Sequence, residues 1–261
     1  LGRLEESKKF YLKAIELAPK RISIYFNLSR IDNDFITSKK IDYLSDLMKN
    51  ENKENSEMSY GYFLLAEHAR KNKNYNLEID YLKKANEHSF NSMLNANKQT
   101  LHYWKNTIPN KYNNFDFKNE NKKSKLANFK PIFIVGLPRS GSTLVEVLIT
   151  SGNKDTISLG ESSIFNGLIA KKFSNDDNNL IDLENINNKI FEIFDNKDLD
   201  FKKFSILDKS LENFFYIDVI IKVFPKAVFI HTFRNIEDNI FAIFKQSLEK
   251  LSWTHSIEDI L

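Results

Sequence analysis

Residues 131–144 read Pro131-Ile-Phe-Ile-Val-Gly-Leu-Pro-Arg-Ser-Gly-Ser-Thr-Leu144, and this stretch decides the fold. An apolar run ends at Gly136, a short loop with a second glycine follows, and an apolar helical pattern begins after it. The pattern predicts a strand, a tight loop and a helix. Backbone N–H groups converge at such a loop, and the start of the helix adds positive potential. The stretch therefore predicts a cradle for a phosphate or a similar anion.

The loop has the spacing of a P-loop, G-x-x-x-x-G-K-[ST], with one substitution. Gly136, Gly141 and Thr143 fit the pattern, whereas Ser142 stands where nucleoside triphosphatases have lysine. That lysine contacts the β- and γ-phosphates, so its absence argues against ATP hydrolysis and ordinary kinase chemistry. Arg139 offers a planar guanidinium to phosphate or sulfonate oxygens. The alternative is an ordinary glycine turn, but the order of strand, loop and helix favours an anion site.

The composition excludes several classes of protein. The chain has 261 residues, of which 41% are hydrophobic, enough for a core, and its net charge is +3. Its basic residues form no stripe, so we expect no nucleic-acid interface. It has no cysteine, and its five histidines lack the spacing of metal ligands, so we expect neither disulfides nor a metal site. No apolar run has the length of a membrane helix and no signal peptide is visible, which predicts a cytoplasmic protein.

Residues 1–106 carry the pattern of paired helices. Apolar residues recur at helical spacing, and a second such segment covers residues 62–90. We predict two to three all-α repeats of the tetratricopeptide type, the first of them incomplete, with a plain helical bundle as the alternative. Such repeats suggest contact with a peptide or a protein. The first segment matches the repeat pattern at Gly2, Leu4, Ser7, Tyr11, Ala14 and Pro19.

Strands and helices alternate from residue 131 onward. Before this point, residues 107–130 are rich in Asn and Lys, which predicts a linker or a solvated surface segment. The alternation predicts an α/β domain over residues 131–261, with a P-loop-like parallel sheet flanked by helices. We expect strands at residues 131–137, 155–159, 204–208 and 227–233, and helices at residues 142–151, 162–173, 184–195, 211–224 and 236–250.

Three charged residues follow the predicted strands. Ligands of such sheets bind beyond the carboxyl ends of the strands, so these residues are candidates for the site. Glu161 could remove a proton from an attacking hydroxyl, although position alone favours an ordinary surface carboxylate. Lys209 could neutralise charge on a bridging oxygen as a bond breaks, or it is an ordinary solvated lysine. Arg234 suits a second phosphate, or an ion pair with Glu237 or Asp238.

Together these segments resemble the sulfotransferases, specifically the bacterial type that carries tetratricopeptide repeats and is related to the protein-tyrosine sulfotransferases. Residues 131–144 resemble the 5′-phosphosulfate loop of the family, and residues 160–161, Gly-Glu, are similar to the position of its catalytic base. Residues 208–214, Asp-Lys-Ser-Leu-Glu-Asn-Phe, resemble the D-K-x-x-x-N-F segment, whose lysine stabilises the transferring group. Residues 224–234 resemble the strand that leads to the 3′-phosphate motif.

The resemblance implies sulfuryl transfer. The donor would be 3′-phosphoadenosine 5′-phosphosulfate (PAPS), with no metal, and the acceptor would be a hydroxyl of a peptide tyrosine, a carbohydrate or a lipid. Glu161 is then the base that deprotonates the acceptor, while Lys209 and Arg139 stabilise the charge in flight. The residues implied to bind the donor are Pro138, Arg139, Ser140, Gly141, Ser142, Thr143, Leu144 and Arg234.

Two departures from the family pattern concern the 3′-phosphate motif. The usual R-D-P is Arg234-Asn235-Ile236, and the usual serine eight residues after the arginine is Ala242. Loss of one charge-assisted hydrogen bond, worth about 1.5–3 kcal/mol, predicts a roughly ten- to hundredfold weaker affinity for the donor. Family members also continue past residue 261, so we expect the domain to be incomplete at its C-terminus.

Two other functions remain open. A P-loop kinase or nucleotidase would need a lysine at position 142 and a metal-binding carboxylate, for which Asp208 is a weak candidate. A repeat-based binding module with an inactive transferase domain is favoured by Asn235 and Ala242. Binding of ATP, of adenosine 3′,5′-bisphosphate or of neither would separate these functions from sulfuryl transfer.

Overall fold

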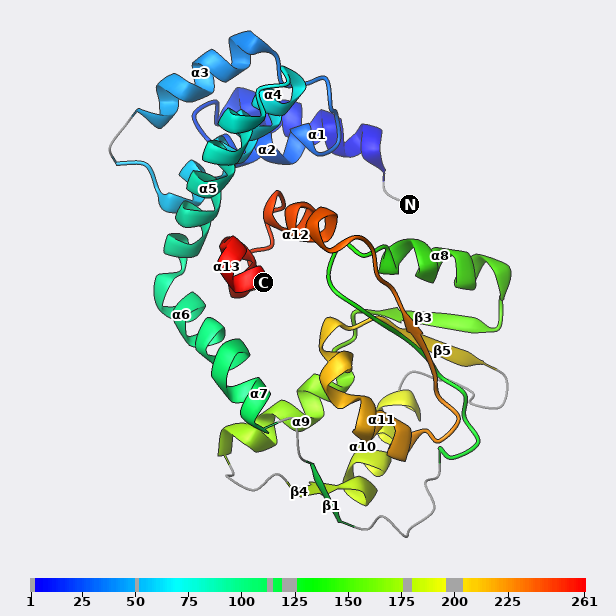
Figure 1. Ribbon diagram of the computed structural model, residues 1–261. Helices are drawn as coiled ribbons and strands as arrows, with labels where there is room; N and C mark the ends of the chain where they lie inside the picture. Colours follow the sequence, from blue (N-terminus) through cyan, green and yellow to red (C-terminus); the bar gives the residue numbers. More distant parts are fainter. Residues whose placement is uncertain (1–2, 50–51, 112–114, 119–125, 176–179, 196–203) are drawn as a thin grey trace. The chain divides into compact units, whose positions relative to one another are not determined.

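The chain divides into two compact units in the computed structural model (Figure 1). One unit is helical and comprises Leu1–His102 with Ile240–Leu261, and the other contains a parallel sheet and comprises Tyr103–Asn239. The boundary falls within helix α12 (Ile236–Phe244). The structure describes residues 3–49, 52–111, 115–118, 126–175, 180–195 and 204–261.

The first unit is a series of helices, as the sequence predicted for residues 1–106. The turn between α4 and α5 contains Lys73, with a φ of +59°, and Asn74, whose Oδ1 accepts a hydrogen bond of 3.3 Å from Leu77 N and caps α5. The helices are confirmed, whereas the type and number of repeats stay a prediction. They are α1 (Leu4–Leu17), α2 (Ile22–Ser29), α3 (Ser38–Met48), α4 (Asn55–Lys71), α5 (Tyr75–Ser92) and α6 (Leu94–His102).

Close packing explains several residues of this unit. Gly61 lies where α4 meets α3, and a Cβ at this position would collide with the sulfur of Met48. Glu57 is buried, and its carboxylate accepts a hydrogen bond from Ile22 N at the start of α2, where the helix itself supplies no acceptor. The small residue and the buried carboxylate thus hold neighbouring helices close together.

Residues 240–261 belong to the same unit. Phe244 packs in one apolar cluster with Phe63 and Leu82, and its carbonyl oxygen accepts a hydrogen bond of 2.8 Å from Asn86 Nδ2. The predicted helix over residues 236–250 ends earlier, at Phe244, where this amide replaces the missing intrahelical donor. Two short helical turns, η3 (Ser252–His255) and α13 (Ile257–Ile260), follow.

The second unit is built on a four-stranded parallel sheet with the strand order β3-β5-β2-β6 (Figure 1). All four predicted strands are confirmed. Ile132 pairs with Leu207 on one side and with Val228 on the other, so the apolar strand before the glycine loop lies inside the sheet. Helix α8 lies on one side of the sheet, and α10 and α11 lie on the other (Figure 1). The strands are β2 (Ile132–Val135), β3 (Thr156–Gly160), β5 (Ser205–Asp208) and β6 (Val228–His231); the helices are α8 (Ser142–Gly152), α9 (Ile164–Asn175), α10 (Leu183–Asp195) and α11 (Ile217–Val223).

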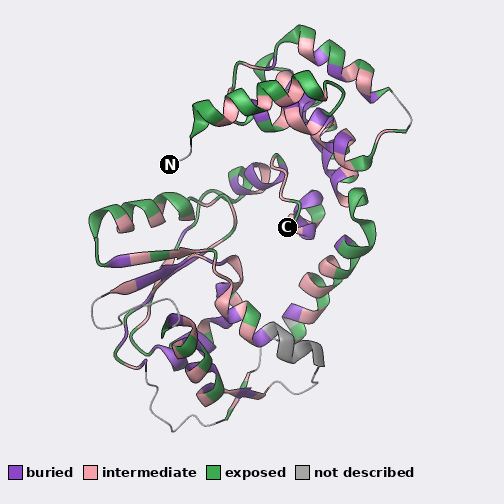
Figure 2. Ribbon diagram, turned by 180° about the vertical axis from the view of Figure 1, so that it is seen from behind, coloured by how far each residue is buried: buried purple, intermediate pink, exposed green. Residues whose placement is uncertain are grey.

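Aromatic residues fill much of the core between the sheet and its helices. The ring of Phe133 on β2 lies 5.9 Å from that of Phe165 and 6.1 Å from that of Phe224, measured between centroids. Buried residues concentrate on the inner strands and on the helices packed against them (Figure 2). This core anchors the carboxyl ends of the strands, where the candidate site lies.

Part of the predicted linker packs into this core. Ile108, Leu126 and Phe129 are buried, and they belong to the apolar cluster of the sheet unit. We expected a solvated segment because Asn and Lys residues predominate in this part of the sequence. They outnumber the three apolar residues that are buried. Residues 112–114 and 119–125 of the predicted linker lie outside the described residues.

Two further differences from the sequence prediction concern short elements. Strands β1 (Asp116–Lys118) and β4 (Leu180–Asp182) pair in parallel in a second small sheet. Neither was predicted, because three residues are too few to show a period of two. The predicted helix over residues 211–224 consists of a 3-10 turn, η2 (Leu211–Tyr216), followed by α11.

Candidate functional site

The loop between β2 and α8 has the backbone geometry of an anion site. Gly136 and Gly141 have φ angles of +150° and +101°, and Arg139 between them has a φ of +66°, which is strained for a residue with a side chain. Gly141 is the N-cap of α8, so the N–H groups of Ser142 and Thr143 have no intrahelical acceptor. These groups and the positive end of the helix can bind an anion at the loop.

Two residues that the sequence analysis missed hold this loop in place. Thr232, which follows β6, donates its N–H to Val135 O at 2.9 Å, and its hydroxyl lies 2.8 Å from Ser140 Oγ. Asn239 is buried, and its Nδ2 donates to Pro138 O at 2.9 Å. No sequence signal marked either residue, because a threonine after a strand and an asparagine in a helix belong to no motif.

The structure brings together Glu161 and Lys209, two of the predicted site residues. Their strands, β3 and β5, are neighbours, and Lys209 Nζ lies 2.7 Å from Glu161 Oε1. The lysine side chain is 10% exposed and that of Glu161 is 70% exposed. Lys209 Nζ also lies 3.7 Å from Glu146 Oε2, a third charged group that the sequence analysis did not select. The lysine therefore lies between the exposed carboxylate of Glu161 and the half-buried carboxylate of Glu146.

Asp208 organises the loops around this ion pair. Its side chain is buried and accepts hydrogen bonds from Ser162 Oγ, from Ser210 N at 2.8 Å and from Asn213 Nδ2 at 2.7 Å. Ser210 Oγ in turn accepts from Ser163 N at 2.7 Å. A buried carboxylate with several donors is a structural anchor, and its spacing to Asn213 explains the D-K-x-x-x-N pattern. Such a role leaves Asp208 unsuited to bind a catalytic metal.

The remaining predicted residues differ in their exposure. Arg234 follows β6, the strand next to β2, and its Nη2 lies 3.7 Å from Asp238 Oδ2. Both side chains are largely exposed, so this pair is weak and the guanidinium remains accessible to a ligand. Ala242 belongs to the helical unit, where it is buried. Arg139, Gly141, Thr143 and Leu144 are exposed, whereas Pro138, Ser140 and Ser142 are half-buried.

Within the described part of the chain, no group of three or more His, Cys, Asp or Glu side chains is placed to hold a metal ion. A search of the same residues finds no helix that is both long and apolar enough to cross a membrane.

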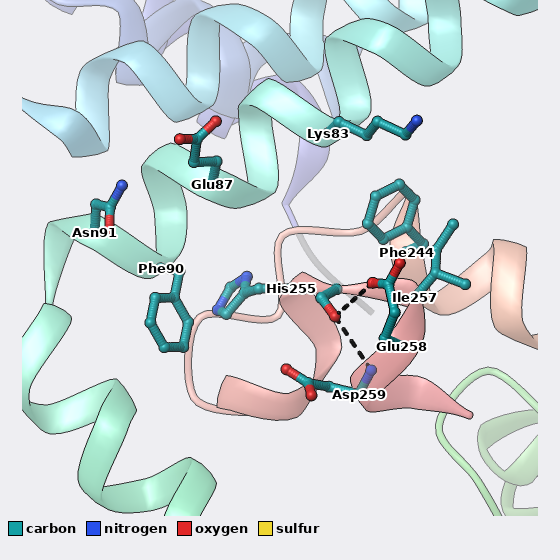
Figure 3. Close-up of a pocket in the computed structure, with 10 residues that line it drawn as sticks. Lys83, Glu87, Phe90, Asn91, Phe244, His255, Ile257, Glu258 and Asp259 are labelled. Atoms are coloured by element: carbon teal, nitrogen blue, oxygen red, sulfur yellow. Dashed lines mark hydrogen bonds between the residues drawn. The ribbon is translucent and has the colours of Figure 1, made fainter.

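A cavity of about 410 Å³ lies in the helical unit, and none of the predicted site residues lines it (Figure 3). His255 is buried at its wall, and its Nδ1 lies 3.3 Å from Asn86 Oδ1. Asn86 Nδ2 donates to Leu82 O and Phe244 O, so its Oδ1 is the acceptor and His255 Nδ1 carries the proton. Burial lowers the pKa of His255, which keeps the ring neutral. His255 is therefore a packed histidine of this unit.

The comparisons with known proteins identify a family for the sheet unit and the segment after it. A family model described as "Sulfotransferase family" matches residues 131–261, half of the chain. The match begins at the strand before the glycine loop and includes Glu161, Lys209 and Arg234. Searches among curated proteins and among solved structures found no match.

Proposed function

The chain belongs to the sulfotransferase family, and on this premise we propose that it transfers a sulfuryl group from PAPS to the hydroxyl of an acceptor. One observation carries the proposal. A phosphate-type loop with Ser142 in place of lysine and the Glu161–Lys209 ion pair lie at the carboxyl ends of neighbouring strands. A nucleoside triphosphate site would require the absent lysine.

The residues of the loop suit the 5′ end of this donor. Backbone N–H groups at the start of α8, the hydroxyls of Ser142 and Thr143, and the exposed guanidinium of Arg139 together offer donors to a phosphosulfate. Arg234, which follows the strand beside β2, would hold the 3′-phosphate. When bound, PAPS supplies the activated sulfuryl group, so the protein needs only to orient the reactants and to stabilise charge.

Burial separates the roles of the two ion-paired residues. The carboxylate of Glu161 is exposed, so an acceptor hydroxyl can approach it and give up its proton there. Lys209 is nearly buried and keeps its ammonium group at the sheet edge, where it would stabilise negative charge on the leaving oxygen. For this chemistry Glu161 has to release Lys209 when the acceptor binds.

The helical unit is proposed to take part in choosing the acceptor. The tight turn between α4 and α5 and Gly61 at a helix crossing support an assignment of tetratricopeptide-like repeats to this region. Repeats of this kind favour a peptide or protein acceptor over a carbohydrate or a lipid.

A thermal-shift experiment tests the donor. Adenosine 3′,5′-bisphosphate at about 100 times its Kd should stabilise the chain by about 2.7 kcal/mol, and ATP should not. Stabilisation by ATP alone would support a kinase, and no stabilisation by either nucleotide would support a binding module. Transfer of labelled sulfate to a tyrosine peptide, a glycan and a lipid alcohol then identifies the acceptor class.

Two variants separate binding from chemistry. Glu161→Ala should lower turnover and leave the affinity for the bisphosphate unchanged, because the carboxylate acts on the acceptor. Arg234→Ala should weaken that affinity in isothermal calorimetry. Glu192→Gln, an exposed change on α10, serves as the control that should alter neither quantity. Unchanged turnover of the Glu161 variant would exclude this residue as the base.

A further inference from the structure

Lys209 has two carboxylate partners that differ in their surroundings. Glu161 Oε1 is nearer, at 2.7 Å, but its side chain is 70% exposed. Glu146 Oε2 is at 3.7 Å, and its side chain is only 14% exposed. Water competes with an exposed ion pair far more than with a buried one. The more distant partner is therefore the more persistent one.

Glu146 is itself fixed from the other side. Its Oε1 accepts a hydrogen bond from Ser158 Oγ, and that hydroxyl accepts one of 3.0 Å from Gly160 N. Gly160 lies at the irregular end of β3, with a φ of +60°, directly before Glu161. The half-buried carboxylate of Glu146 thus connects α8, β3 and β5, three elements that lie side by side (Figure 1). By contrast, the interaction that the structure describes for the Glu161 carboxylate is the one with Lys209.

From this arrangement we propose that Glu146 is a positioning residue, which retains Lys209 at the sheet edge while Glu161 exchanges the lysine for the acceptor hydroxyl. The proposal rests on the sulfuryl transfer proposed above. The physical reason is that the ammonium group of Lys209 needs a negative counter-ion throughout the reaction. If Glu161 turns to the acceptor, a nearly buried ammonium would lose its counter-ion unless a second carboxylate stays in place. Glu146 meets this need because Ser158 and the helix hold it independently of Glu161.

Competitive acetylation tests whether Glu146 retains Lys209, and it does not require an active sulfotransferase. The chain is treated with an acetylating ester, and the modification of Lys209 is compared with that of exposed Lys154 by mass spectrometry. Glu161→Gln should raise the relative rate at Lys209 only about two- to fivefold, as expected for an exposed pair. Glu146→Gln should raise it about tenfold or more, because a charged partner that is largely shielded from water is lost. Lys209→Arg confirms the peptide assignment.

Ser158→Ala provides a variant that keeps every charge. It removes the hydroxyl that anchors Glu146, so the rate at Lys209 should rise to an intermediate value. If Glu146→Gln does not fold, this variant and Glu146→Asp still decide the question. A larger rise for Glu161→Gln than for Glu146→Gln, or no rise for Ser158→Ala, would overturn the proposal.

Kinetics connects this retention to the reaction. Glu146→Gln should lower kcat for sulfate transfer at least about tenfold and leave the KM for PAPS near its original value, with partial recovery in Glu146→Asp. A purely structural role would instead lower the melting temperature and raise KM together. Bisphosphate binding reports on the proposed function separately. If it fails, sulfuryl transfer is wrong, whereas the acetylation rates still decide which carboxylate holds Lys209.

Discussion

Gly136 is the residue at which the structure makes its sharpest prediction. A Cβ added to Gly136 would lie 2.7 Å from Thr232 Oγ1 and closer still to the carbonyl oxygen of Thr232. The backbone φ of +150° is also unfavourable for alanine. Gly141 provides a matched control, because its φ is +101° and an added Cβ would meet nothing within 4 Å. The first substitution combines a collision with backbone strain, and the second brings strain alone.

The expected costs follow from these two contributions. Backbone strain at a glycine position costs roughly 1–3 kcal/mol, and overpacking against a neighbour that cannot move costs roughly another 1–3 kcal/mol. Gly136→Ala should therefore lower the free energy of unfolding by about 2–6 kcal/mol and Gly141→Ala by about 1–3 kcal/mol. Because domains are stable by only about 5–15 kcal/mol, this difference is easily measured.

Urea denaturation followed by tryptophan fluorescence measures both costs in the sheet unit. The chain has two tryptophans, and Trp104, whose ring lies 5.6 Å from that of Phe215, belongs to this unit. In a Trp253→Phe background, Trp104 reports on the sheet unit alone. With a slope of about 2 kcal/mol per molar urea, the midpoint should fall by about 1–3 M for Gly136→Ala and by about half as much for Gly141→Ala. Equal midpoints for the two variants would refute the close approach of Thr232 to the loop.

Three further predictions concern the loop and the helical unit. Thr232→Val removes the hydroxyl 2.8 Å from Ser140 Oγ, and it should weaken the binding of adenosine 3′,5′-bisphosphate about two- to tenfold in calorimetry. Equal affinity would contradict the role of Thr232 in holding the loop. Because burial lowers the pKa of His255, the unfolded chain binds more protons below pH ~6.5, so stability is complete above that pH and falls as the pH decreases. His255→Gln should flatten the decline in melting temperature between about pH 7 and 5, although His88, which burial also shifts downward, preserves part of it. Burial and the carboxylate of Glu249 raise the pKa of Tyr60 to about 12. The contribution of Tyr60 to stability is therefore complete below the ordinary pKa of 10.0 and is lost as the pH rises toward 12. Tyr60→Phe should remove the last phenol step from an absorbance titration.

Much of the fold could be predicted because its signals are local. The four strands of the main sheet are apolar runs bounded by glycine, proline or charged residues, and each lies within a few residues of its predicted place. Elements of three residues, such as β1 and β4, carry no such period, and a few apolar anchors in a polar segment, such as Phe129, gave no warning of their burial. The early end of α12 depends on Asn86, which lies far away in the sequence.

The candidate site was predictable only in part. Glu161 and Lys209 could be selected because residues at the carboxyl ends of neighbouring parallel strands approach one another, and the structure places them 2.7 Å apart. Glu146 could not be selected, because it lies inside a helix and acquires its importance from a lysine on another strand. The anchoring of the loops by Asp208 was likewise invisible, since a buried carboxylate and a catalytic one look alike in a sequence.

By itself, the sequence determined that the chain has a helical part, a parallel sheet, and a glycine loop of the P-loop type in which Ser142 replaces lysine. These features follow from hydrophobic period and from residues within one loop, which act over a few positions of the chain. Only the tertiary structure decided what fixes that loop and which carboxylates face Lys209. Thr232 and Ser140 are 92 residues apart, and they meet because β6 takes its place beside β2 in the sheet. Strand order depends on the packing of the whole unit, so the contacts that it creates are absent from any local pattern.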